Sequence, residues 1–104
     1  MIIYKKEVDF KISKLKHAAA MQKALADMGK TEAKIQKARK QDLVEALTMM
    51  LDMFRQFFVT ATGEDVLADC DDFEEAQEAY YQFLADIKNQ KTAMLAPYSP
   101  DSIQ

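Results

Sequence analysis

The stretch LVEALTMMLDMFRQFFVTA, residues 43–61, decides the fold of this chain. Its apolar residues recur at intervals of three and four, which is the period of an amphipathic helix. They are Leu43, Leu47, Met50, Leu51, Phe54, Phe57, Phe58 and Ala61. The stretch therefore predicts a long central helix, which Thr62 and Gly63 are expected to end because glycine suits the left-handed position after a last turn.

This central helix has more apolar side chains than one face can hold. Positions 49, 53 and 57 form one row, and positions 50, 54 and 58 form a second row turned by about 100°. Core packing is the simplest role for any one of them, but a small domain is expected to leave one row exposed to a partner. The residues assigned to partner binding are Met50, Met53, Phe54, Phe57, Phe58 and Tyr81.

The composition favours few turns and long helices. The chain has 104 residues, of which 49% are hydrophobic and 30% charged, with only two glycines and two prolines. This length indicates one domain, expected over residues 1–95. Residues 96–104, with Pro97 and Pro100, are expected to form a flexible tail.

The segment before the first helix has a strand pattern. Apolar and polar residues alternate up to Ile12, which predicts a β-hairpin over residues 2–12 with its turn near Lys5 and Lys6. Ser13 is a candidate N-cap for a first helix over residues 14–28, and Gly29 is expected to end that helix. The face expected to be buried consists of Leu15, Ala18, Ala19, Gln22, Leu25 and Met28.

The remaining chain predicts two more helices. The second is expected to start at Lys30 with a lysine-rich, solvated portion and to continue through the central stretch. The third is expected over residues 72–94, with Asp71 and Glu74 at capping-box spacing. Its expected face consists of Phe73, Ala76, Tyr80, Phe83, Leu84, Ile87 and Met94. The predicted fold is therefore mainly α: an N-terminal β-hairpin followed by three principal helices, the middle one long.

Charge is distributed unevenly along the chain. Residues 1–40 have a net charge of +7 and residues 41–104 a net charge of −10, which together give −3. Such separated halves can support association between copies, so a homo-oligomer is one expectation. The basic segment 30–40, following a helix and Gly29, also permits an alternative function as a small nucleic-acid-binding regulator. The negative total charge and the absence of interleaved aromatic residues disfavour that alternative.

The sequence offers little for catalysis or for a cofactor. His17 and Cys70 are the only residues of their types, so no histidine–cysteine metal set is expected. Counted from Asp69, the acidic run has Phe73 where a calcium loop needs an oxygen ligand and Glu74 where it needs glycine. We therefore expect no metal, no cofactor and no enzyme activity.

Charges also argue against a membrane location. Glu45, Asp52 and Arg55 interrupt the central apolar stretch, so a membrane span is not expected. Lys5 and Lys6 come too early for a secretory signal, which favours a cytoplasmic protein.

Several positions together resemble a known family. In that family an N-terminal hairpin ends in a strand that is matched here by Val8, Asp9, Phe10, Lys11 and Ile12. In the turn of this hairpin, family members often have Asn-Gly where the present chain has Tyr4 and Lys5. The further matches are an alanine-rich helix over 18–28, then Phe54, Phe57, Phe58 and Gly63, and finally Ala79, Phe83, Gln90 and Lys91. Over residues 1–91 the layout resembles small proteins encoded among tail genes of phages and prophages of Gram-positive bacteria.

Members of that family look like tail assembly chaperones. The resemblance implies a helical protein that covers the apolar tape-measure protein until tail-tube subunits polymerise around it. It also implies that the partners are phage tail proteins in the cytoplasm of the host cell.

Overall fold

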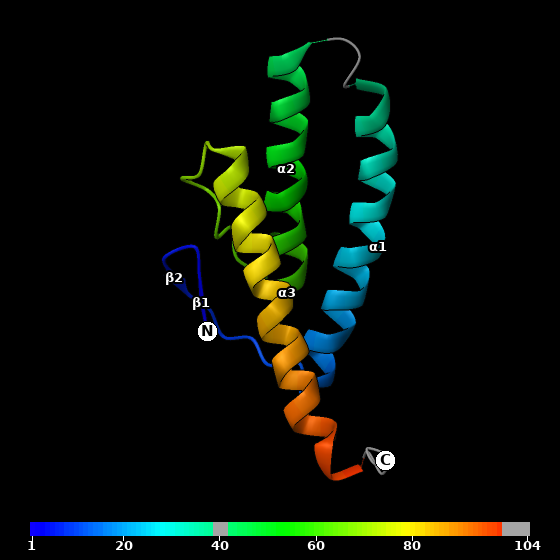
Figure 1. The fold of residues 1–104 in the computed structure, drawn as a ribbon, viewed down its shortest axis with the longest axis vertical. Helices are drawn as coiled ribbons and strands as arrows, with labels where there is room; N and C mark the ends of the chain where they lie inside the picture. The colour runs from blue at the N-terminus through cyan, green and yellow to red at the C-terminus, as the bar shows by residue number, and fades with distance from the viewer. Residues whose placement is uncertain (39–41, 99–104) are drawn as a thin grey trace.

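The computed structural model describes residues 1–38 and 42–98, and it confirms a mainly helical fold with a short N-terminal hairpin (Figure 1). The three principal helices have 24, 20 and 23 residues, so the first is slightly longer than the middle one. The elements are β1 (Ile2–Ile3), β2 (Lys6–Glu7), α1 (Leu15–Ala38), α2 (Leu43–Thr62), α3 (Phe73–Leu95) and the 3-10 turn η1 (Ala96–Tyr98). α1 and α2 lie side by side and antiparallel, and α3 crosses α2 and extends past its end (Figure 1).

The first helix does not end at Gly29, which corrects the predicted boundary. α1 continues through Gly29 to Ala38, so Lys30, Lys34 and Lys37 belong to the second half of α1. A glycine inside a helix costs about 1 kcal/mol relative to alanine. Packing of Met28 and Ile35 on either side of it outweighs that cost, since both side chains are buried. Residues 24–38 therefore form one continuous helix, without the turn that would separate the two helices of a DNA-binding helix–turn–helix.

The buried face of α1 also differs from the prediction. Leu15 is 84% exposed and Leu25 is 43% exposed, although both were expected in the core. Ala19 and Gln22 are exposed as well. The residues that α1 buries are Met21, Ala24, Met28 and Ile35. The position of α2 selects this face, because α1 packs along α2 and each apolar row is buried only where a neighbouring helix covers it.

The hairpin is shorter than predicted, and its turn lies at Tyr4 and Lys5. Their φ angles are 45° and 74°, and left-handed φ at both central residues is what a two-residue hairpin turn of type I′ requires. Of the hairpin predicted over residues 2–12, the two strands cover only Ile2–Ile3 and Lys6–Glu7. Val8 still exchanges hydrogen bonds with Met1, its N–H donating to the Met1 carbonyl at 2.7 Å. Beyond it the chain turns into the core, where Phe10 is buried.

The segment between β2 and α1 joins the hairpin to two helices. Phe10 stacks on His17, with ring centroids 5.0 Å apart, and meets the ring of Phe83 edge-on at 5.2 Å. The Lys11 N–H donates to Nδ1 of His17 at 2.9 Å, and the Ile12 N–H donates to the Gln90 side-chain oxygen at 2.9 Å. These contacts tie the N-terminal segment to the start of α1 and to α3.

Aspartate caps explain the starts of α2 and α3, whereas the start of α1 differs from the prediction. α1 starts at Leu15, and the Lys14 carbonyl accepts the first helical hydrogen bond, from the Ala18 N–H. Lys14, and not the predicted Ser13, therefore occupies the N-cap position. Asp42 caps α2 by accepting from the Val44 N–H. Asp72, and not the predicted Asp71, caps α3 by accepting from the backbone N–H groups of the first turn. A side-chain oxygen at such a position satisfies amides that have no partner within the helix.

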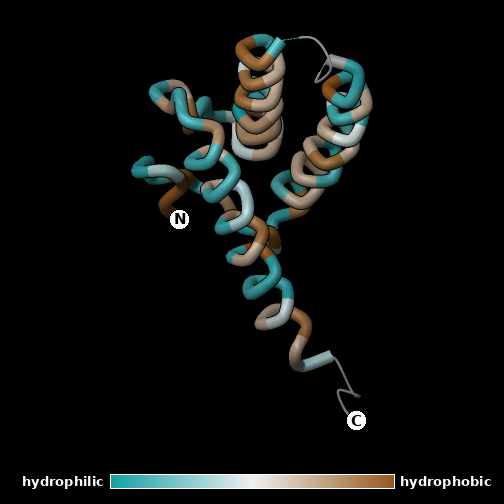
Figure 2. Tube along the Cα trace, turned by 45° about the horizontal axis from the view of Figure 1, so that its top comes forward, coloured by the Kyte–Doolittle hydropathy of each residue, from teal (hydrophilic) through white to brown (hydrophobic). Residues whose placement is uncertain are grey.

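α2 is the most apolar of the three helices (Figure 2). Its side chains build the centre of an aromatic core with α3. Phe57 meets Tyr80 at 4.9 Å, and Phe58 meets Phe83 at 5.4 Å, both nearly edge-to-face. Edge-to-face pairs add about 0.5–1.5 kcal/mol beyond the burial of their area. This cluster holds α3 against α2.

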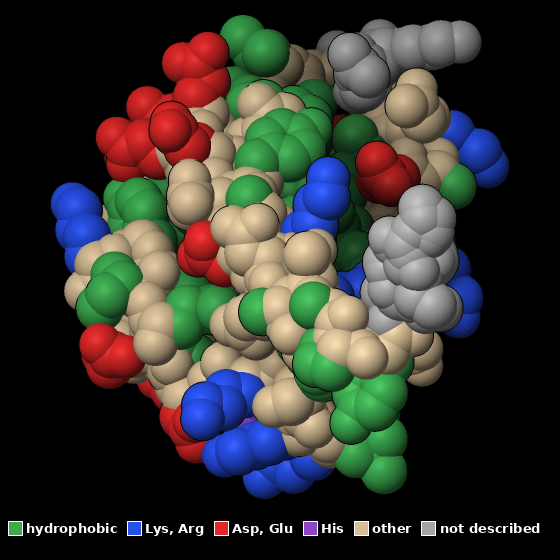
Figure 3. All heavy atoms as spheres, turned by 60° about the horizontal axis from the view of Figure 1, so that its bottom comes forward, with side chains coloured by type: hydrophobic (Ala, Val, Ile, Leu, Met, Phe, Trp, Pro, Cys, Tyr) green, Lys and Arg blue, Asp and Glu red, His purple; other side chains and the backbone are tan. Residues whose placement is uncertain are grey.

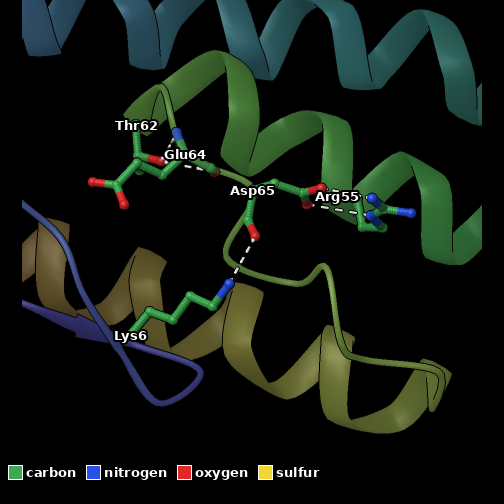
Figure 4. A network of polar contacts seen from close by, with 5 residues as sticks. All are labelled: Lys6, Arg55, Thr62, Glu64 and Asp65. Carbon is green, nitrogen blue, oxygen red and sulfur yellow. Dashed lines mark hydrogen bonds and ion pairs between the residues drawn. The ribbon is translucent and has the colours of Figure 1, made fainter.

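The loop between α2 and α3 is held by a polar network (Figure 4). Gly63 ends α2 as predicted, with φ of 80° and its N–H donated to the Val59 carbonyl. Arg55 donates to both carboxylate oxygens of Asp65, at 3.2 Å and 2.6 Å. Lys6 of the hairpin donates to the Asp65 carbonyl at 3.4 Å. The network links α2, the loop and the hairpin.

Candidate partner-binding groove

An open groove of about 510 Å³ lies between α1 and α3, with α2 at its base. We call it the aromatic groove. Its floor consists of Met28 and Ile35 from α1 and of Met53 and Phe54 from α2, all of which are buried. The floor is therefore apolar, and it contains two methionines whose flexible side chains can adapt to a ligand.

The walls and rim of the aromatic groove add aromatic and polar groups. Met50, Tyr80 and Leu84 are half-buried in its walls. Burial raises the pKa of Tyr80, and the nearby Glu32 carboxylate raises it further. The other rim residues are Gln36, Gln77 and Tyr81. The groove thus combines an apolar floor with hydrogen-bonding groups along its edges, which is the usual composition of a binding site.

A second hollow of about 530 Å³ continues the groove toward the end of α3. We call it the distal groove. Leu84 borders both hollows, and Leu25, Met94 and Leu95 leave much of their apolar surface exposed here. Seen from this end of the molecule, hydrophobic side chains lie at the surface among acidic and basic groups (Figure 3). Together the two hollows form one elongated apolar surface between α1 and α3.

Four of the six residues assigned to partner binding line the aromatic groove. They are Met50, Met53, Phe54 and Tyr81. Phe57 and Phe58 lie deeper, at 2% and 0% exposure. Tyr81 is 59% exposed and Met50 half-buried, so these two offer the most surface to a partner.

The structure corrects the prediction that one row of α2 stays exposed. Of the six side chains assigned to partner binding, four from α2 are buried: Met53, Phe54, Phe57 and Phe58. The row of Met53 and Phe57 lies against α1. The row of Phe54 and Phe58 meets aromatic rings of α3. A helix sandwiched between two others buries both rows, and the exposed apolar surface moves to the gap between its neighbours.

Sequence reasoning missed the contribution of α1 to the groove. Ile35 was assigned to a solvated helix portion, and Tyr80 and Leu84 were assigned to the core. A signal was available, because Met21, Met28 and Ile35 recur every seven residues, as expected for one contact face of a continuous helix. The assumed helix end at Gly29 hid this repeat.

A smaller hollow of about 280 Å³ lies between the hairpin and α3. The Tyr4 hydroxyl donates to Glu75 at 2.7 Å, and this bond, with a smaller contribution from Cys70, raises the pKa of Tyr4. The Cys70 thiol is buried and donates to the Asp72 carbonyl at 3.4 Å, near the start of α3. These groups fasten the hairpin and the α3 start to each other.

The described part of the chain has neither a group of metal ligands nor a membrane-spanning helix. Within residues 1–38 and 42–98, no group of three or more His, Cys, Asp or Glu side chains is placed to share a metal ion. In the same ranges, no helix combines the length and the apolar character needed to cross a bilayer. Arg39 and Lys40 of the basic segment, and residues 99–104 of the expected tail, lie outside the described residues.

Known proteins give no further guide to this groove. No protein-family model, functionally described protein or solved structure matches the chain. The resemblance to tail assembly chaperones therefore stays a prediction from the layout of the sequence. The geometry of the groove is the observation from which a function can be argued.

Proposed function

We propose that this chain is a non-enzymatic protein-binding protein that holds an apolar helical segment of its partner in the aromatic groove. The supporting observation is an open, methionine- and tyrosine-containing surface between two helices. An amphipathic helix can lay its apolar face into such a groove and expose its polar face to water. The polar side chains of Glu32, Gln36 and Gln77 border the groove and can bond to the edges of a bound helix.

The chemistry of the groove suits reversible binding. Each apolar partner side chain that becomes buried contributes about 1.5–3 kcal/mol, before the entropic costs of association are subtracted. A few anchors therefore give moderate affinity. The methionines Met28, Met50 and Met53 allow the groove to accept apolar side chains of different shapes.

The partner that we propose is the tape-measure protein of a phage tail. The layout of residues 1–91 resembles tail assembly chaperones, and the apolar groove fits the task that the resemblance implies. In this role the chain covers apolar helices of the tape-measure protein in the host cytoplasm. Polymerising tail-tube protein then displaces it, which requires the moderate affinity argued above.

A substitution in the wall of the groove tests this proposal. Met50→Glu places a charge beside the floor without emptying the core, because Met50 is only half-buried. We expect it to weaken binding of peptides from the apolar helices of the tape-measure protein by at least about tenfold, since a buried unpaired charge is costly. Isothermal titration calorimetry measures the affinity, and circular dichroism checks the fold.

The matched control is Leu43→Glu, which introduces the same charge on α2 at a side chain that is 72% exposed and does not line the groove. This variant should bind as the unmodified chain does. Equal affinity of the Met50→Glu variant, with its helix content intact, would exclude the groove as the binding surface.

The alternative function is nucleic-acid binding by α1. Lys16, Lys23, Lys30 and Lys37 recur every seven residues and are exposed, so they form a basic stripe along the helix. Such a stripe can follow phosphates without entering a groove of DNA. A salt titration of duplex binding decides: a chain that does not bind at about 50 mM salt, where phosphate contacts are strong, has no such function.

A further inference from the structure

The outer face of α3 has a repeating pattern of exposed residues. Exposed residues recur along it at alternating intervals of four and three, which is the spacing of the seam of a coiled coil. These residues are Glu74, Glu78, Tyr81, Ala85, Lys88, Thr92 and Leu95. Tyr81 and Leu95 are 59% and 50% exposed, so large apolar side chains point outward at the middle and at the end of the seam.

The seam is complementary to itself when read in the opposite direction. In an antiparallel pair of α3 helices centred on position 83, Glu78 of each chain lies opposite Lys88 of the other. Tyr81 lies opposite Ala85, so a large side chain meets a small one. A two-fold axis repeats each of these matches, because both partners use the same surface. Opposite charges and complementary sizes therefore coincide in one register.

We propose that a second copy of this chain packs on this face, with α3 antiparallel to α3 and the two-fold axis near position 83. Tyr81 of each copy then covers Ala85 of the other, and Glu78 pairs with Lys88 on both sides of the axis. Glu74 of each copy lies opposite Thr92 of the other at the rim of the contact, and Leu95 lies beyond the paired length of α3.

Electrostatics within one chain favours a second copy as the occupant. Glu74 and Glu78 lie one turn apart, and like charges at this spacing destabilise a helix. Among the ion pairs that residues 1–38 and 42–98 form with one another, none involves Glu78 or Lys88. A second copy brings Lys88 to this acidic end and relieves the repulsion, and it does so twice.

The proposed contact is modest in size, and Tyr81 is the one seam residue that it shares with the aromatic groove. α3 has 23 residues, so it is about 34 Å long at 1.5 Å per residue. A single helix pair of this length buries less than the roughly 1,600 Å² of a standard interface, so the dimer is expected to form at micromolar or higher concentrations. Glu78 and Lys88 do not line the aromatic groove, so substitutions at these two positions leave its lining unchanged. Lys88 borders the distal groove, and Glu78 borders the hollow beside the hairpin.

Charge exchange is the test. Sedimentation equilibrium of the whole chain is expected to show a monomer–dimer equilibrium. Glu78→Lys alone, or Lys88→Glu alone, turns two attractive pairs into repulsive ones and should weaken the dimer by at least about tenfold. The double variant Glu78→Lys/Lys88→Glu restores opposite charges and should recover most of the lost affinity. An equal mixture of the two single variants should form a heterodimer.

Two charge changes outside the seam serve as matched controls. Asp69→Lys and Lys34→Glu change exposed charges of the same types away from the seam, and they should leave the equilibrium unchanged. A chain that remains monomeric at about 1 mM, where association would be worth only about 4 kcal/mol, overturns the proposal. The proposal is equally overturned if the single charge reversals leave the dimer affinity unchanged, or if the double variant does not restore it. Peptide affinity in the aromatic groove reports separately on the proposed function.

Discussion

Arg55 holds Asp65 through two hydrogen bonds, of 3.2 Å and 2.6 Å, and so clamps the loop after α2 back onto the helix that precedes it. Both oxygens of the carboxylate are used, which gives the pair the bidentate geometry that makes an arginine–carboxylate contact directional. The loop carries Val66 and Leu67, whose side chains are fully buried. The pair therefore stabilises the placement of two core residues as well as the loop itself.

Asp65→Asn should make the protein less sensitive to acid. Arg55 lowers the pKa of Asp65 below its ordinary value of 3.8. The stabilisation from the charged pair is thus present above that value, and it is lost as the pH falls through the lower pKa of the folded state. Since both side chains are partly exposed, we expect a loss of only about 0.5–1 kcal/mol at neutral pH.

Urea unfolding at a series of pH values measures this effect. The free energy of unfolding of the unmodified chain should fall more steeply below pH 4 than that of the Asp65→Asn variant. Asp69→Asn, at an exposed aspartate of the same loop, is the control and should keep the original slope. Parallel curves for the unmodified chain and the Asp65→Asn variant would show that the pair does not contribute.

The two glycines should respond to alanine in opposite directions. Gly29 lies inside α1 with no atom within 4 Å of an added Cβ, so Gly29→Ala should stabilise the protein by about 0.8–1 kcal/mol. Gly63 has a φ of 80°, which disfavours any Cβ, so Gly63→Ala should destabilise by about 1–2 kcal/mol. Thermal unfolding compares the two. Destabilisation by Gly29→Ala would indicate that α1 breaks at this residue, as the sequence first suggested.

Phe58→Ala should test whether the second apolar row of α2 belongs to the core. Phe58 is fully buried and meets the rings of Phe57 and Phe83. Removing it should cost about 3–5 kcal/mol, because a cavity replaces its contacts. Leu43→Ala, on the exposed side of the same helix, should change stability by less than about 0.5 kcal/mol. Denaturant midpoints that agree for both variants would place Phe58 at the surface.

Local signals in the sequence determined the elements of this protein. The three- and four-residue spacing between Leu43 and Ala61 predicts α2, and Gly63 ends it because its left-handed backbone suits glycine. The alternation near the N-terminus predicts a hairpin, and acidic residues before Phe73 mark the start of α3. These signals act over a few residues, so no knowledge of the rest of the chain is needed to interpret them.

Tertiary structure alone decided which apolar faces are covered. Continuation of α1 through Gly29 depends on the burial of Met28 and Ile35 against other helices, since glycine by itself favours a break. The two rows of α2 are both buried because α1 and α3 cover them from different sides, so the surface predicted at Phe57 and Phe58 does not form. Burial of an apolar side chain depends on neighbours that are distant in the sequence. The open groove beside Tyr81 exists because α1 and α3 both pack on α2 and leave a gap between them.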